Sequence, residues 1–151
     1  MIRQFIKGIS LLSVIMTLAL TNAVLTAHGQ SPRHVKAQVP FDFIVGGKVL
    51  PAGEYVVQPS SDEGSAIIIR NAATGQASIR LSNSIETNSR KTDGRLVFHR
   101  YQDTYFLVEV WRPGMSSGRH LIQSKLERAM ERELALGTKN YDTVVLVATA
   151  N

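Results

Sequence analysis

The chain has 151 residues, of which 44% are hydrophobic, so it is long enough for one globular domain and too apolar to be disordered throughout. Its formal net charge is +5, but Arg3 and Lys7 fall in an apolar leader, and the mild excess that remains is not typical of nucleic-acid-binding domains. The absence of cysteine excludes disulfides, thiolate chemistry and cysteine-based metal sites.

Residues 1–29 have the layout of a secretory signal peptide. A short basic segment precedes the apolar run Ile9–Leu20, and Ala27-His28-Gly29 places small residues before a cleavage site at Gln30. Ala23 ends a second possible cleavage site, and an uncleaved membrane anchor is the alternative. The apolar run is shorter than the ~20 residues that span a bilayer. We therefore expect residues 30–151 to form an extracytoplasmic β-rich domain, periplasmic or secreted, that meets the membrane only through its leader.

The first half of this domain reads as short strands separated by tight turns. Val35–Val39 alternates apolar and polar residues, and Pro40 predicts an edge or a bulge at its end. From Val39 onward the chain alternates again, and Val39, Phe41, Phe43 and Val45 are expected on one side of a strand, with Asp42 on the other. Turns follow at Gly46-Gly47 and at Leu50-Pro51-Ala52-Gly53. The next strand is expected from Glu54 to Gln58.

Two hairpins and a closing strand are predicted further along. The first hairpin pairs Ala66–Arg70 with Gln76–Leu81, and the second pairs Arg95–Tyr101 with Thr104–Trp111. The polar stretch from Ser82 to Gly94 is predicted to be a long exposed loop. Both strands of the second hairpin carry apolar residues on both faces, which is typical of strands covered on two sides, and their register is left open. The last strand runs from Tyr141 to Ala148.

One helix is predicted from Lys125 to Leu136. Ser124 and Glu127 have the spacing of a capping box, and Gly137 suits the C-terminal cap. The apolar stripe consists of Leu126, Met130 and Leu134. Glu127 and Glu131 form one stripe along the helix, and Arg128 and Arg132 form the next. Facing stripes of opposite charge stabilise an exposed helix and do not imply a ligand.

Seven or eight short strands with one C-terminal amphipathic helix predict an all-β domain, either a single sandwich or a small barrel. The helix is expected to cover one face or one open end.

Several segments resemble a recurrent family of small secreted bacterial proteins of unknown function. The resemblance is carried by Pro40-Phe41-Asp42-Phe43-x-Val45-Gly46 and by Leu50-Pro51-Ala52-Gly53-x-Tyr55. The segments 98–101, 105–107 and 131–135 are similar to the same family. The resemblance implies an exported β-rich domain and brings no activity, cofactor or catalytic residue with it.

No residue pattern predicts a catalytic, cofactor-binding or metal site, so we expect the protein not to be an enzyme. Gly114-Met115-Ser116-Ser117-Gly118 matches the G-x-S-x-G motif of hydrolases, but His120 follows too closely and no acid lies between them. We interpret the motif as a Gly- and Ser-rich loop, and His99 as a partly buried strand residue rather than a ligand or base.

One group of basic residues is the best candidate for a binding surface. It comprises Arg80, Arg90, Lys91, Arg95 and Arg100, with Tyr101 nearby. For an exported protein the partners that fit are anionic envelope polysaccharide or lipid head groups rather than nucleic acid. The leading hypothesis is a non-catalytic exported domain that acts by binding or as an envelope component. The alternatives are a small barrel that carries an apolar ligand and a hydrolase that uses Ser116 or His99.

Overall fold

The computed structural model describes residues 34–61, 64–88, 92–135 and 141–150. Pro32–Asn151 forms a compact unit of its own, separate from Met1–Ser31. The predicted signal peptide and its cleavage sites therefore lie outside the described residues. No helix in the described ranges has the length and hydrophobicity needed to cross a bilayer.

Ten strands and one helix make up the described part of the chain. The first six strands are β1 (Val35–Val39), β2 (Phe43–Val45), β3 (Lys48–Leu50), β4 (Gly53–Pro59), β5 (Ala66–Asn71) and β6 (Ala77–Glu86). They are followed by β7 (Gly94–Tyr101), β8 (Thr104–Trp111), β9 (Ser117–Leu121), the helix α2 (Lys125–Ala135) and β10 (Asp142–Ala150). The predicted all-β class with one C-terminal helix is confirmed.

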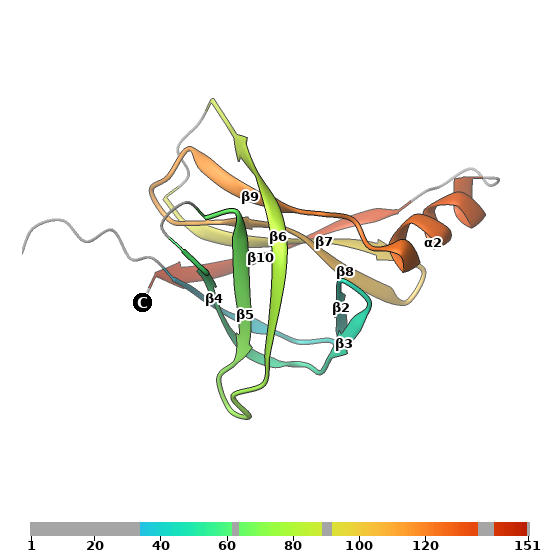
Figure 1. Ribbon diagram of the computed structural model, residues 1–151, viewed down its shortest axis with the longest axis horizontal. Coiled ribbons are helices and arrows are strands. Elements are labelled where there is room, and N and C mark those ends of the chain that lie inside the picture. Colours follow the sequence, from blue (N-terminus) through green and yellow to red (C-terminus); the bar gives the residue numbers. More distant parts are fainter. Residues whose placement is uncertain (1–33, 62–63, 89–91, 136–140, 151) are drawn as a thin grey trace, which may run out of the picture. The chain divides into compact units, whose positions relative to one another are not determined.

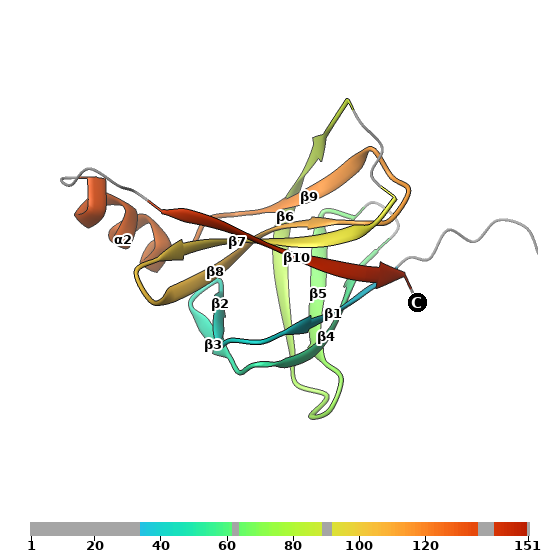
Figure 2. The same cartoon turned by 180° about the vertical axis from the view of Figure 1, so that it is seen from behind.

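Eight of the strands close into an antiparallel barrel. Around the barrel the order is β8-β7-β10-β1-β4-β5-β6-β9, and β9 pairs with β8 to complete the circle. The structure thus selects the barrel over the sandwich. Figures 1 and 2 show β6 and β10 on opposite sides of the barrel, with α2 at one end.

The short hairpin of β2 and β3 lies outside this circle, because β8 divides its pairing between two neighbours. The start of β8 pairs in parallel with β2, at Tyr105 and Phe106. Its last three residues, Glu109–Trp111, pair with β9 instead. At the end of the barrel near α2, the hairpin therefore occupies the place that a longer β9 would fill.

Side chains fill the barrel interior. The largest are Phe43, Tyr55 and Phe98, whose rings meet edge to face at 4.9 to 5.4 Å between centroids. Aliphatic residues of β1, β4, β5 and β7 surround them. An eight-stranded barrel is just wide enough for side chains to fill, and this one is filled.

A second apolar cluster lies outside the barrel wall, under α2. It contains Ile44, Val97, Tyr101, Phe106, Val108 and Trp111, and Met130 and Leu134 of the helix pack against it. An irregularity in the pairing of β7 with β8, after Val97, leaves Val108 unpaired and shifts the register. The prediction that the second hairpin is covered on two sides is confirmed, because the core covers one face and α2 the other.

Three sequence-based expectations need correction. The stretch Ser82–Gly94 is not a loop throughout, because β6 continues to Glu86 by pairing with β9. The strand β9 itself was not predicted, because Ser117-Gly118-Arg119 carries no apolar alternation. Pro40 marks neither an edge strand nor a bulge: it follows β1, which lies between β10 and β4, and it separates β1 from β2.

The segments Pro40–Gly46 and Leu50–Tyr55 form a structural unit around the turn between β3 and β4. The Asp42 carboxylate accepts a hydrogen bond from the backbone N–H of Ala52 at 2.8 Å. The hydroxyl of Tyr55 donates to the carbonyl oxygen of Pro51 at 2.7 Å. These two hydrogen bonds therefore hold the turn in place.

We expect Asp42→Ala to lower the free energy of unfolding by about 1 kcal/mol, since it removes one hydrogen bond from the turn. Asp42→Asn keeps an oxygen acceptor and is expected to lose less. Urea unfolding of the two variants and the wild type measures both changes. Equal stability of all three proteins would show that this hydrogen bond does not hold the turn.

Candidate functional site

The strand β6 has an inverted pattern, with polar residues facing the barrel interior and apolar residues facing out. Arg80 pairs with Ile67 and Ser78 pairs with Ile69, and both isoleucines belong to the core. Directly paired residues of an antiparallel sheet share a face, so Arg80 and Ser78 point inward. Ile79 and Leu81 consequently point outward, where they are exposed.

Arg80 spans the gap between β6 and the β2–β3 turn. Its Nη2 donates to the carbonyl oxygens of Val45, at 3.2 Å, and Gly46. Gly46 has a φ of +57°, and a Cβ there would lie 1.8 Å from the guanidinium carbon of Arg80. The turn thus needs glycine both for its backbone and for the room that Arg80 occupies. The buried Nε of Arg80 has no hydrogen-bond partner among the described residues.

A groove of about 490 Å³ opens beside this turn, between β6 and the start of α2. The β2–β3 turn contributes Gly46 and Gly47, and the chain from Ile122 to Leu126 forms the opposite wall. Three cations, Arg80, Lys125 and Arg128, line the groove, and no carboxylate is among its lining residues in the described ranges. Leu81, Ile122 and Leu126 supply an apolar floor.

The helix α2 begins at this groove. Ser124 caps it by accepting a hydrogen bond on Oγ from the backbone N–H of Glu127 at 3.0 Å. The first turn of a helix carries a partial positive charge that adds to the charges of Lys125 and Arg128. Together these groups give the groove a positive potential above an apolar surface.

The structure distributes the basic residues predicted from the sequence over separate places. Arg95 lies over the ring of Trp111, with its guanidinium carbon 4.7 Å from the ring centroid. Arg100 lies five residues further along β7, roughly 16 Å away, and contacts Tyr105 and Asp103. Arg80 is in the groove, and Arg90 and Lys91 lie outside the described residues. Of the predicted basic residues that the structure describes, only Arg80 lines a cavity together with other cations, Lys125 and Arg128.

Tyr101 is buried beneath α2 in the second apolar cluster. Burial away from water, with smaller contributions from the carboxylates of Glu127 and Glu131, raises the pKa of Tyr101 to about 12. Tyr101 therefore supports the helix and is not available to a ligand in solution.

His99 and Glu127 form the link between β7 and α2. The Glu127 carboxylate, which is buried, lies 3.6 Å from Nδ1 of His99. The ring of His99 stacks on Tyr141 at 3.9 Å between centroids. The prediction that Glu127 belongs to a solvated stripe was wrong, because its carboxylate is buried and faces His99. Of the predicted capping box, the structure shows the hydrogen bond from the backbone N–H of Glu127 to the Ser124 hydroxyl.

The G-x-S-x-G match has a structural explanation. Gly114 adopts a φ of +71° in the turn after β8. Gly118 lies under the indole of Trp111, where a Cβ would be 2.6 Å from the ring. Ser116 precedes β9, and His120 lies four residues further on, about 13 Å along an extended chain. His120 lies instead 3.8 Å from Glu109, so the geometry does not favour a Ser116–His120 pair.

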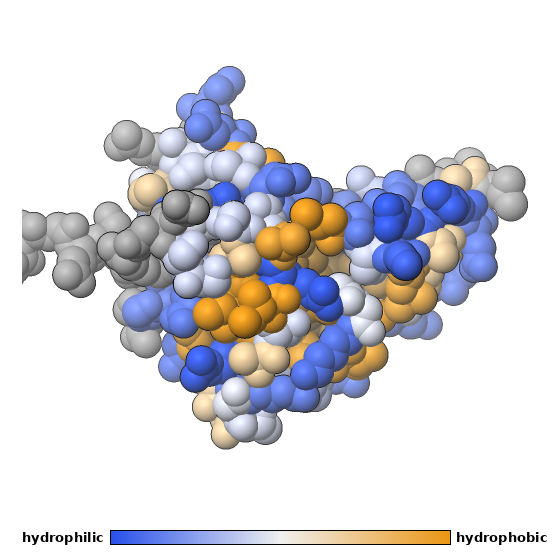
Figure 3. Space-filling view, viewed as in Figure 1, coloured by the Kyte–Doolittle hydropathy of each residue, from blue (hydrophilic) through white to orange (hydrophobic). Residues whose placement is uncertain are grey.

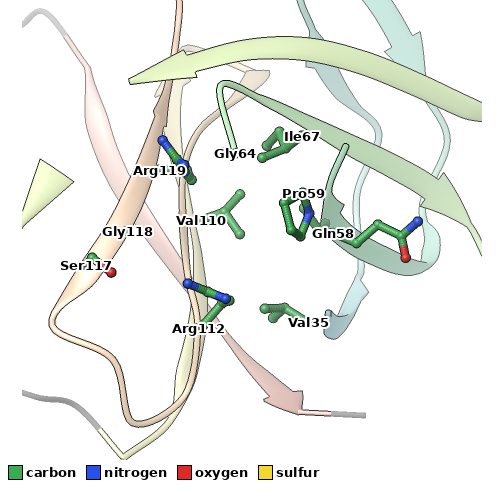
Figure 4. Close-up of a pocket in the computed structure, with 11 residues that line it drawn as sticks. Val35, Gln58, Pro59, Gly64, Ile67, Val110, Arg112, Ser117, Gly118 and Arg119 are labelled. Atoms are coloured by element: carbon green, nitrogen blue, oxygen red, sulfur yellow. The ribbon is translucent and has the colours of Figure 1, made fainter. Parts of the chain in front are cut away.

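A second, smaller cavity of about 90 Å³ lies at the other end of the barrel. Figure 4 shows Arg112 and Arg119 on one side of it, with Pro59, Ile67 and Val35 on the other. Arg119 lies against Gly64, where a Cβ would be 2.0 Å from its Nη2. Ligand pockets typically measure ~300–1,000 Å³, so this cavity holds at most a small chemical group.

Within the described ranges, no group of three or more His, Asp or Glu side chains is placed to hold a metal ion.

Comparisons with protein-family models, with curated proteins and with solved structures found no match. The resemblance to the family of secreted proteins therefore stays a prediction, and the function has to be inferred from the geometry.

Sequence reasoning missed the groove because its walls are far apart in the chain. Lys125 and Arg128 read as ordinary charges of a solvated helix, and Ile122 belongs to a short connection. The only signal was Arg80 between two apolar residues of a predicted strand. That signal acquires a meaning only when the register of β6 is known.

We expect the high pKa of Tyr101 to make stability pH-dependent at alkaline pH. In the unfolded chain a tyrosine ionises near pH 10, whereas Tyr101 keeps its proton in the fold up to a pKa of about 12. The free energy of unfolding should therefore fall between these values, by up to ~1.4 kcal/mol per pH unit. Urea unfolding of wild type and Tyr101→Phe across this range measures the difference, and equal slopes for the two proteins would contradict it.

Proposed function

We propose that this protein is an exported, non-catalytic β-barrel domain that binds an anionic ligand in the groove beside α2. In this groove a cavity of ligand size is lined by both positive charges and apolar side chains. It combines about 490 Å³ of space with three lining cations, an apolar floor and a helix start. Such a combination fits a ligand that has a negative group and an apolar part.

The proposal of export depends on the sequence of residues 1–29, with its basic start, apolar run and small residues before Gln30. The absence of cysteine is compatible with it, because the filled barrel holds the fold without disulfides. In the envelope the anionic ligands in reach are polysaccharides and lipids.

The alternative function, a carrier of an apolar ligand, agrees with the closed barrel but not with its interior, which side chains fill. Phe43, Tyr55 and Phe98 occupy the space in which a carrier would hold its ligand. The cavity at the barrel end holds about 90 Å³. The geometry therefore favours the groove on the outside over a site within the barrel.

Titration of the unit Pro32–Asn151 with monomeric octyl phosphate, followed by the amide signals in NMR, tests the proposed site. We expect shifts at Gly46 and Gly47 and along Ile122–Arg128. Octyl glucoside has the same tail without the charge and should bind more weakly. Arg128→Gln should weaken octyl phosphate binding about fivefold, as expected for the loss of a contact worth ~1 kcal/mol.

Arg132→Gln serves as the matched control, because Arg132 is exposed on the same helix but does not line the groove. Its affinity for octyl phosphate should equal that of the wild type. Shifts confined to the cavity of Arg112 and Arg119, or no shifts at all, would contradict the proposed site.

Expression of the full chain in a bacterium tests the proposed export. We expect a shortened product in the extracytoplasmic fraction, with Gln30 or Val24 at its N-terminus by sequencing. The full-length chain in the cytosol, with its first 29 residues intact, would show that export does not occur.

A further inference from the structure

The outer face of β6 continues the groove into an apolar surface. Ile79 and Leu81 are 63% and 62% exposed, and Ile122 and Leu126 are 54% and 45% exposed. The backbone N–H of Ile122 donates to the carbonyl oxygen of Leu81 at 3.2 Å, so these two residues are direct neighbours. Figure 3 shows hydrophobic side chains gathered over β6, beside hydrophilic ones.

The register of β6 makes this surface apolar, although the same strand contains polar residues that could have faced solvent. The same strand holds Ser78 and Ser82 on its buried face. A shift of one residue would place Ile79 and Leu81 in the core and the serines in solvent. The fold instead buries hydroxyls and exposes two large aliphatic side chains, which is typical of a face that a partner covers.

Basic side chains lie on two sides of the apolar surface. Arg70 points outward on β5, in the same direction as the exposed Ile79 of the next strand. Lys125 and Arg128 lie on its other side, on the first turns of α2. Within the described ranges, no carboxylate forms an ion pair with Arg70, Lys125 or Arg128.

We propose that this face, made of Ile79, Leu81, Ile122 and Leu126 with Arg70, Lys125 and Arg128, docks on the surface of an anionic phospholipid membrane. The apolar side chains enter the boundary between head groups and acyl chains, and the cations meet the lipid phosphates. Peripheral membrane binding increases with buried apolar area and with attraction to anionic lipids, and this face supplies both. A polysaccharide would match the cations but leave the four exposed aliphatic side chains without a partner.

This inference rests on the proposed function and names the ligand of the groove as a lipid head group in a bilayer. It also orients the protein, because β6 and the start of α2 face the membrane and β10 faces away. The strand β10 is the fourth neighbour of β6 in either direction around the eight-stranded barrel.

Cosedimentation of the unit Pro32–Asn151 with lipid vesicles tests the inference. We expect binding to vesicles of phosphatidylcholine mixed with phosphatidylglycerol and little binding to pure phosphatidylcholine. Raising the salt to 1 M shortens the Debye length from ~10 Å to ~3 Å and should release much of the bound protein. The unit without the leader is used because an apolar leader would bind vesicles by itself.

Variants locate the contact. Leu81→Ser and Ile122→Ser should each weaken partitioning into the mixed vesicles by roughly tenfold, through loss of aliphatic burial. Lys125→Gln and Arg128→Gln should each weaken it by about fivefold. These side chains are exposed, so the fold should tolerate the changes, and urea unfolding checks that it does.

Matched controls come from the opposite side of the barrel. Val147 on β10 is 70% exposed, and Val147→Ser should leave vesicle binding unchanged. Lys36 on β1 pairs with Glu54 at 3.1 Å, and Lys36→Gln should likewise have no effect. Equal losses for Val147→Ser and Leu81→Ser would overturn the proposed docking face.

The outcomes separate this inference from the proposed function. If octyl phosphate binds in the groove but anionic vesicles do not bind, the membrane inference is wrong and the groove remains a site for a soluble ligand. If dextran sulfate binds through Lys125 and Arg128 while vesicles fail, the partner is a polysaccharide and the inference is again wrong. Failure of all three probes would overturn both proposals.

Discussion

Closure of the barrel by β9 is the constraint on which the rest of this structure depends. Only three residue pairs join β9 to β8, and one of them places Gly118 beneath the indole of Trp111. Five pairs join β9 to β6 on its other side. Because β6 is paired along both edges, its register is fixed, and with it the direction in which every side chain of β6 points.

The shortness of the β8–β9 ladder has a second consequence. It leaves the first part of β8 free to pair with β2, so the β2–β3 hairpin stands at the end of the barrel near α2. Arg80 reaches from β6 to the carbonyl oxygens of that hairpin's turn. The groove is the space that remains between this hairpin, β6 and the helix start. Its positive charge and apolar floor are thus products of how the barrel closes.

The helix α2 is held by two kinds of contact. Met130 and Leu134 cover the apolar cluster on the outer wall of β7 and β8. Glu127 brings a buried carboxylate to His99 and lies close enough to Tyr101 to help raise its pKa. A helix anchored in this way presents its first turn at a fixed place, which is what a binding site at the helix start requires. The contact between His99 and Glu127 thus joins α2 to β7.

The sequence alone determined the all-β class, most of the strands and the helix, because period-two alternation, glycine turns and a serine cap are local signals. The hydrogen bonds of Asp42 and Tyr55 were found only in the structure, although their partners lie within ten residues of them in the chain. Only the tertiary structure decided that the sheet closes, that β6 turns its apolar side outward and that Arg80 meets Lys125 and Arg128. These outcomes depend on strand register and on pairing between distant segments, and neither leaves a trace in the order of neighbouring residues.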